Sequence, residues 1–318
     1  MYSLIPVVCA QDITALVRAL PGSVAQGLIW GIMAIGVFLT FKILDFADLT
    51  VDGTMATGGV VTVMLILKGW NPVAAVAVAF VAGMLAGFIT GVLHTVLGIP
   101  DILAGILTQL SLYSINLNIS EGKANQAVNV DMYNLVVSGR DNPAAIVAVV
   151  IILAVVIAFM YWFFGTELGF TIRATGCNPN MSRAQGINTN VAKVIALVFS
   201  NGLVGFAGGL LSQYQGNFDV NMGRGSIVIG LASVIIGEVL GEAIFGKKLN
   251  FSGRLAFVAV GSIIYYIVIQ FVLWLGLPTI DMKMFSAMVV AIFLAVPYLR
   301  GKAKNSYRKA AKGGAGKC

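Results

Sequence analysis

Charged residues are scarce in this chain. Asp, Glu, Lys and Arg make up only 10% of its 318 residues, whereas 58% are hydrophobic. A soluble globular domain usually carries about 25% charged residues. A chain of this length with so few charges cannot cover its surface for contact with water, which excludes a soluble enzyme.

Cysteine and histidine are scarcer still. The three cysteines, Cys9, Cys177 and Cys318, lie far apart and form no CxxC pair, so the sequence predicts neither a disulfide framework nor a metal site. The one histidine, His94, falls near the end of an apolar stretch, where we expect a packing residue with satisfied polar atoms. No set of clustered nucleophile and base residues supports an intramembrane enzyme.

Long apolar stretches, by contrast, are abundant. A bilayer-spanning helix needs about 20 mostly apolar residues. We therefore expect an all-α, polytopic transmembrane helix bundle with about eight to ten membrane segments, some of them broken or re-entrant, and a short N-terminal element, 1–20, that ends at Pro21. The nine stretches that approach the required length are 22–41, 54–67, 73–97, 102–117, 143–164, 191–213, 226–245, 255–275 and 284–299.

The net charge of +7 has a definite location. All seven basic residues from Arg300 onward are unopposed, whereas the 13 basic residues before Arg300 are balanced by 13 acids. A neutral body excludes a nucleic-acid-binding surface. We divide the chain into a transmembrane domain, 1–299, and a basic tail, 300–318, which the positive-inside rule places in the cytoplasm.

Loop charges extend this orientation. The loops 165–193 and 246–254 carry an excess of Lys and Arg, whereas 118–142 does not. The first two are expected in the cytoplasm and the third outside. These placements agree with simple alternation of the spans, and the side of the N-terminus stays open.

Carboxylates interrupt the apolar sequence before the second segment, at Asp45, Asp48 and Asp52, with Thr54 close behind. Carboxylates at membrane depth are costly and are candidates for function. Two interpretations remain open. The group lines a translocation pathway or gate, or it caps the segment that begins near Thr54.

Two further polar sites flank the seventh segment. Asp219 and Asn221 lie in a glycine-broken stretch before it, as pathway residues or as an exposed turn. Glu238 and Glu242 lie four residues apart, on one helix face. They form a cytoplasmic gate or a proton-linked site, or they are an interfacial pair that meets Lys247 or Lys248.

Small residues recur at helical spacing. Gly83, Gly87 and Gly91 lie along one helix face, and a similar set follows in the sixth segment: Gly202, Gly205, Gly208 and Gly209. Such stripes allow helix backbones to approach closely. They predict either packing within one subunit or a dimerisation seam.

The basic loop 165–190 contains a short helix with defined ends. Asn178 is placed to cap it and Pro179 to occupy its first position, and Gly186 can end it in the left-handed conformation. A helix so delimited is typical of an element that docks into a partner. The residues assigned to it are Asn178, Pro179, Ser182, Arg183, Ala184, Gln185 and Gly186.

This loop resembles a known family. Its run Glu-Leu-Gly-Phe, Arg-Ala-Thr-Gly, Asn-Pro and Arg-Ala-Gln-Gly-Ile-Asn is similar to the cytoplasmic loop of ATP-binding cassette (ABC) importer permeases of the branched-chain amino acid and ribose class. The similarity continues, in order, through Leu44–Gly59, Ile99–Leu103 and Gly223–Gly237 and covers nearly all of 20–300. Within the class, the chain is most similar to the subgroup associated with amino acids, including aromatic ones.

The resemblance implies a permease subunit in a prokaryotic cell membrane, not an enzyme. It implies a homodimer that works with ABC ATPase subunits and an extracytoplasmic substrate-binding protein, and that carries a small polar solute, most simply an amino acid. The short helix would be the coupling helix that sits in a cleft of the ATPase. No Gly-x4-Gly-Lys-[Ser/Thr] run occurs, so this chain binds no cofactor, and ATP and magnesium belong to the ATPase.

Two features of the sequence depart from the family pattern, and alternatives remain for the substrate and for the class of transporter. Asn180-Met181-Ser182-Arg183 replaces an acid and paired alanines, and Glu238 and Glu242 stand where the family has paired glycines. Sugars or nucleosides are alternative substrates. The alternative class is an ion-coupled secondary transporter that uses these glutamates or the aspartates.

Overall fold

The computed structural model describes residues 13–275 apart from 131, 134, 247 and 248, together with 284–292 and 295. Several predictions lie outside these residues. They are the tail 300–318, most of the N-terminal element, the proposed partners Lys247 and Lys248, and the end of the ninth segment.

The described part of the chain is an all-α membrane bundle with eight helices that are long and apolar enough to cross a bilayer. The ninth predicted segment is helical over 284–292. The long helices are α1 (Ile13–Phe38, continued by the π-helix η1, Leu39–Ile43), α2 (Thr50–Leu67), α3 (Pro72–Thr95), α4 (Asp101–Ile119), α5 (Asn142–Phe164), α8 (Thr189–Gln215), α9 (Ser226–Phe245) and α10 (Phe251–Trp274).

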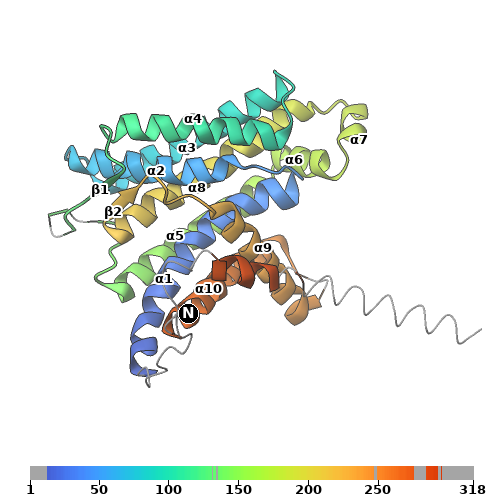
Figure 1. The fold of residues 1–318 in the computed structure, drawn as a ribbon. Helices are drawn as coiled ribbons and strands as arrows, with labels where there is room; N and C mark the ends of the chain where they lie inside the picture. The colour runs from blue at the N-terminus through green and yellow to red at the C-terminus, as the bar shows by residue number, and fades with distance from the viewer. Residues whose placement is uncertain are drawn as a thin grey trace, which may run out of the picture.

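Short elements mark the two ends of the bundle (Figure 1). At one end, β1 (Asn125–Ala127) pairs antiparallel with β2 (Asn217–Asp219). At the other end lie α6 (Glu167–Cys177) and α7 (Pro179–Ala184). We refer to these as the strand end and the α7 end.

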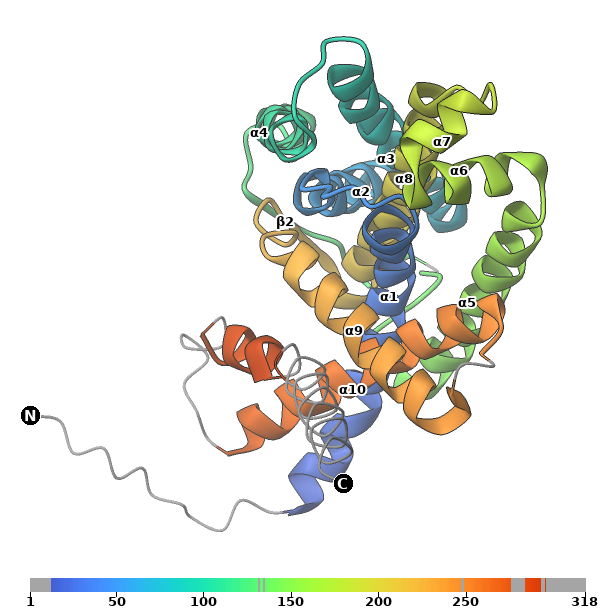
Figure 2. The ribbon, with the colours of Figure 1, turned by 90° about the vertical axis from the view of Figure 1, so that its right-hand side faces the viewer.

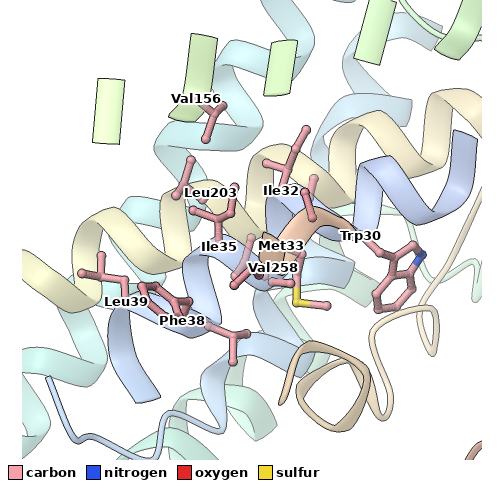
Figure 3. Packing of buried hydrophobic residues seen from close by; sticks show 14 of the residues in the cluster. Trp30, Ile32, Met33, Ile35, Phe38, Leu39, Val156, Leu203 and Val258 are labelled. Carbon is pink, nitrogen blue, oxygen red and sulfur yellow. The ribbon is translucent and has the colours of Figure 1, made fainter. Parts of the chain in front are cut away.

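The core is built around α1 and α8. Figure 3 shows side chains of α1 such as Ile32, Ile35 and Phe38 beside Leu203 of α8 and Val258 of α10, and all five are buried. In Figure 2, α8 lies among α1, α2 and α3, in agreement with the contacts between these helices. Because α1 and α8 are surrounded by protein, apolar side chains cover most of their circumference.

The glycine stripes serve packing within the subunit. The Cα atoms of Gly83 and Gly87 face the backbone carbonyls of Asn201 and Leu197 on α8, so closely that a Cβ atom would collide with them. A Cβ atom on Gly91 would lie 3.1 Å from the Cα atom and side chain of Val194, a tight but less severe contact. The structure supports intrasubunit packing for this stripe, and the dimerisation-seam interpretation of it is wrong.

Two predicted boundaries are corrected. Pro21 lies inside α1 and ends no element, so the first span begins well before residue 22. The break before the second segment covers only 44–49, and Asp52 and Thr54 lie in the first turns of α2. The helix starts early because the Asp48 carboxylate accepts a hydrogen bond from the Thr50 backbone N–H, at 2.9 Å, which satisfies one of the free donors at a helix start.

Candidate functional site

The break at 44–49 packs against α3, α4 and α8. Asp45 has a left-handed backbone conformation, with φ of +57°, and its side chain is exposed. Asp48 is only 2% exposed. The chain therefore turns at Asp45 and inserts Asp48 between helices.

Asp48 and Thr54 join one hydrogen-bonded network through α8. The Asn201 side-chain amide donates to Asp48 Oδ2 at 2.6 Å, and Asn201 Oδ1 accepts from the Thr54 hydroxyl at 2.8 Å. All three side chains are buried. A buried carboxylate is costly unless it is hydrogen-bonded, so this arrangement holds the break and α2 against α8.

A chain of threonines continues the network to two more helices. The hydroxyls of Thr50 and Thr90 lie 2.7 Å apart, and Thr90 donates to Thr108 at 2.9 Å. These residues belong to α2, α3 and α4 and are fully or almost fully buried. Four helices are thus connected by polar contacts at one depth of the bundle.

Asp52 caps a helix that is distant in sequence. Its Oδ1 accepts from the Ser226 hydroxyl at 2.8 Å and the Ile227 N–H at 2.9 Å, and its Oδ2 accepts from the Gly225 N–H at 2.9 Å. These donors form the N-terminus of α9, where a negative charge is favourable. The prediction that the aspartates cap their own segment near Thr54 is therefore wrong for Asp52.

Asp219 and Asn221 form a local turn at the strand end. Asp219 lies in β2 opposite Asn125, and its Oδ1 accepts from the Asn221 N–H at 2.6 Å. Asn221 is exposed. From there the chain runs back along α2: Met222 lies next to Gly59, and Gly223 lies against the backbone of Asp52. The structure therefore brings the stretch before α9 together with Asp52, but not with Asp45 or Asp48.

A recess lies where this stretch meets α2 and α4. Its volume is about 300 Å³, and we call it the α2–α4 recess. Sequence analysis missed the α4 side, although Gln109, Tyr113 and Asn116 recur at helical spacing in an otherwise apolar segment, which was a readable signal. The lining residues are Asp52, Gly53, Ala56, Gln109, Leu110, Tyr113, Asn116, Val220 and Arg224.

The glutamates of α9 lie at a separate site. Glu238 forms an ion pair with Lys42 of η1, at 2.9 Å between Nζ and Oε2, and its side chain is 18% exposed. Glu238 and Glu242 line a cavity of about 350 Å³ with Leu249 and Arg254. The partner found for Glu238 thus comes from the first span, far from it in sequence.

The short helix in the basic loop is confirmed as a structure. The Asn178 side chain accepts from the Met181 N–H at 3.0 Å, Pro179 occupies the first turn, and Gly186 has φ of +80°. Arg183 Nε donates to the Thr189 hydroxyl at 2.9 Å. Within this helix Ser182 is only 4% exposed, and its hydroxyl donates to the Asn178 carbonyl, so its side chain faces the subunit.

His94 is a satisfied packing residue, as expected. Its Nδ1 lies 2.9 Å from the Ile99 carbonyl, its Nε2 lies 2.9 Å from Lys193 Nζ, and its ring packs edge-on against Phe46. Within the described residues, no three His, Cys, Asp or Glu side chains gather closely enough to hold a metal ion.

Residues 20–297 match the family described as branched-chain amino acid transport system / permease component. Because the match covers most of the chain, the protein belongs to this family. It is thus a multi-pass membrane permease, and the spans of the bundle are the membrane-crossing helices of a transport component.

Individual relatives carry different solutes. The tyrosine transport system permease protein of Clostridioides difficile (strain R20291) is 37% identical over 284 residues, which cover 89% of this chain and 93% of that protein. The ribose import permease protein of Escherichia coli (strain K12) is 27% identical over 237 residues, 73% of this chain and 71% of that protein. No solved structure matches the chain.

Proposed function

We propose that this chain is the membrane-embedded subunit of an ABC importer for an amino acid, and that it works as a homodimer with ATPase subunits and a substrate-binding protein. The observation that carries the proposal is α7, a capped helix that projects from one end of the bundle. A self-contained carrier has no need for such an element.

The exposed face of α7 is suited to docking. Met181 is 63% exposed, and Pro179, Asn180 and Ala184 are exposed with it. Large apolar side chains displayed on a charged, water-facing loop are typical of a protein interface. The Asn178 cap and the inward Ser182 hold this face in place without a partner.

The helix before α7 ties the docking face to the bundle. Gly176 of α6 lies against the backbone of Ile43, at the end of η1, with no room for a Cβ atom. Arg173 lies over the ring of Phe251 of α10, with its guanidinium carbon 4.4 Å from the centroid, a cation–π contact. A displacement of α7 would therefore be transmitted through α6 to η1, which continues α1, and to α10. A rigid-body switch between two packed states requires such a direct connection.

Charge supports one orientation. The α7 end carries Arg173 and Arg183, and basic residues stay on the cytoplasmic side. In this orientation α7 meets the ATPase, the tail 300–318 is cytoplasmic, and the strand end faces the substrate-binding protein outside a prokaryotic cell membrane. ATP and magnesium would be held by the ATPase.

Amino acids are the substrate class that the relatives favour. The tyrosine permease is more similar to this chain than the ribose permease, 37% against 27% identical, and shares more of its length. Sugars and nucleosides are the alternatives. The ion-coupled carrier is disfavoured because Asp48 and Glu238 are each engaged by protein donors, which compete with a transported cation.

The decisive experiment tests α7. Met181→Asp places a charge on the docking face at a side chain that is 63% exposed, so the chain should fold normally while its co-purification with the coexpressed ATPase falls by about tenfold. That loss corresponds to about 1.4 kcal/mol of binding free energy.

Met132→Asp is the matched control, since Met132 is 74% exposed in the loop at the opposite end. It should retain the ATPase fully. Equal retention by both variants would contradict the docking role of α7, and a wild-type chain that never retains the ATPase would remove the proposal as a whole.

A further inference from the structure

The α2–α4 recess contains an unpaired buried amide. Asn116 is 1% exposed, and among the described residues neither its Oδ1 nor its Nδ2 has a hydrogen-bond partner. Leaving buried polar atoms unpaired costs about 1–3 kcal/mol each. Because no contact within the subunit offsets this free-energy cost, the unpaired amide needs another explanation. A ligand that enters the recess would supply both missing partners.

The walls of the recess carry opposite charges. Asp52 lies on the α2 side and Arg224 on the stretch before α9. Asp52 Oδ2 accepts one hydrogen bond in the structure, from Gly225, and a carboxylate oxygen has room for a second. The Arg224 side chain is exposed to the recess and, within the described part of the chain, has no carboxylate within 4.0 Å.

The position of the recess suits a translocated solute. Gln109 is the ninth of the 19 residues of α4, about 12 Å along the helix at 1.5 Å per residue, whereas the hydrocarbon core is about 30 Å thick. The recess therefore extends from near the middle of the membrane, at Gln109, toward the strand end, since Asn116 is the sixteenth residue of α4. It also adjoins the first turns of α2 and the chain break before α9, and broken helices within the membrane are where transporters hold their solutes.

We infer that the α2–α4 recess binds the charged main-chain end of a free amino acid during its passage, an inference that rests on the proposed function. Arg224 would pair with the α-carboxylate, Asp52 would attract the ammonium group, and the Asn116 amide would donate to one and accept from the other. A sugar could bond to Asn116 and Gln109 but would bring no anionic partner for the Arg224 guanidinium. The volume of about 300 Å³ is at the lower end of the range for ligand pockets, as a small solute requires.

Arg224 also borders a second hollow, which accommodates an aromatic side chain. This cavity of about 340 Å³ is lined by Trp30, Tyr265, Tyr266 and Ile269. Aromatic rings pack favourably against one another. L-tyrosine is therefore the probe for the test, since it carries both charged main-chain groups and an aromatic side chain.

The test is saturation-transfer NMR on the purified full-length chain in detergent, with L-tyrosine as the probe. Asn116→Leu should weaken L-tyrosine binding by about tenfold or more, since hydrogen bonds to charged groups are lost, while thermal stability stays equal or rises. Asn118→Leu is the matched control, because Asn118 is exposed on the same helix and bonds only to the Ser114 carbonyl. It should leave L-tyrosine binding unchanged.

Arg224→Gln tests the charge assignment. It should weaken binding of L-tyrosine by about tenfold but leave tyramine, which lacks the carboxylate, unaffected. If the Asn116→Leu and Arg224→Gln variants bind L-tyrosine as the wild type does, the recess is not the binding site. This holds even where the assembled transporter takes up amino acids. If the wild type binds D-ribose and not L-tyrosine, both this inference and the amino acid substrate are wrong.

Discussion

At the scale of single residues, the contacts of the carboxylates differ from those that the sequence predicts. Asp52 is an acid in an apolar helix, and its three donors come from the start of α9. Asp48 is paired with Asn201, 153 residues away. Each carboxylate supports a join between distant helices, and the ligand role proposed for Asp52 comes in addition to this structural role.

Asp52→Asn should lower the free energy of unfolding by about 2 kcal/mol. An amide has no negative charge to offer the α9 N-terminus, and its NH₂ group faces donors rather than acceptors. The measurement is a denaturant titration of the purified chain, followed by helical circular dichroism.

Asp45→Asn provides the comparison at the same break. Asp45 is exposed with φ of +57°, a conformation that Asn tolerates well, so its unfolding free energy should stay within about 0.5 kcal/mol of the wild type. If the two variants lose equal stability, the capping role of Asp52 is wrong.

At the scale of elements, the central fact is the close contact of α3 with α8. Gly83, Gly87 and Gly91 remove the Cβ atoms along one face of α3, and the backbone of α8 fills that space. Without a hydrophobic driving force between helices in lipid, close backbone packing is a main source of association. The stripe therefore stabilises the subunit itself.

Gly87→Val should destabilise the chain by about 2 kcal/mol, because the added side chain meets the Leu197 backbone and forces α3 from α8. Ala77→Val places the same side chain at an exposed position of α3 and should be nearly neutral. Thermal unfolding of both purified variants measures the difference, and an equally stable Gly87→Val chain would count against this packing role.

At the scale of the whole molecule, the bundle has two distinct ends. The short β-pair and the 128–141 loop lie at one, and α6 and α7 at the other. The proposed orientation assigns the first to the outside and the second to the cytoplasm, since the basic loop residues gather at the α7 end.

Cysteine labelling of intact cells checks this orientation. In a background with the native cysteines replaced by serine, Met132→Cys should react with a membrane-impermeant maleimide, whereas Met181→Cys should react only after the membrane is opened. Both side chains are exposed, at 74% and 63%, so in cells that express this chain without the ATPase and the binding protein, access depends on the side of the membrane. The opposite pattern would invert the assignment and separate α7 from a cytoplasmic ATPase.

Much of the fold could be predicted because each membrane helix is recognisable from the length and apolarity of its own segment. Length and apolarity identified all eight spans, and the Asn178-Pro179 and Gly186 signals identified the capped helix. The boundaries near Pro21 and Asp52 were wrong because tertiary contacts extend helices past residues that usually interrupt them. Gln109 and Asn116 were missed as site residues because their helical spacing marks a polar face of α4, whereas their position opposite Asp52 is decided by the tertiary structure.

The sequence by itself determined that this protein is a membrane bundle, which segments cross, and which family it resembles, since these follow from local apolarity and short motifs. Only the tertiary structure decided which partners the polar groups have. It paired Lys42 with Glu238, placed Asp52 on α9 and left Asn116 unpaired in a recess. The physical reason is that a buried polar group must find its partner in space, and here the partners come from helices far apart in the chain.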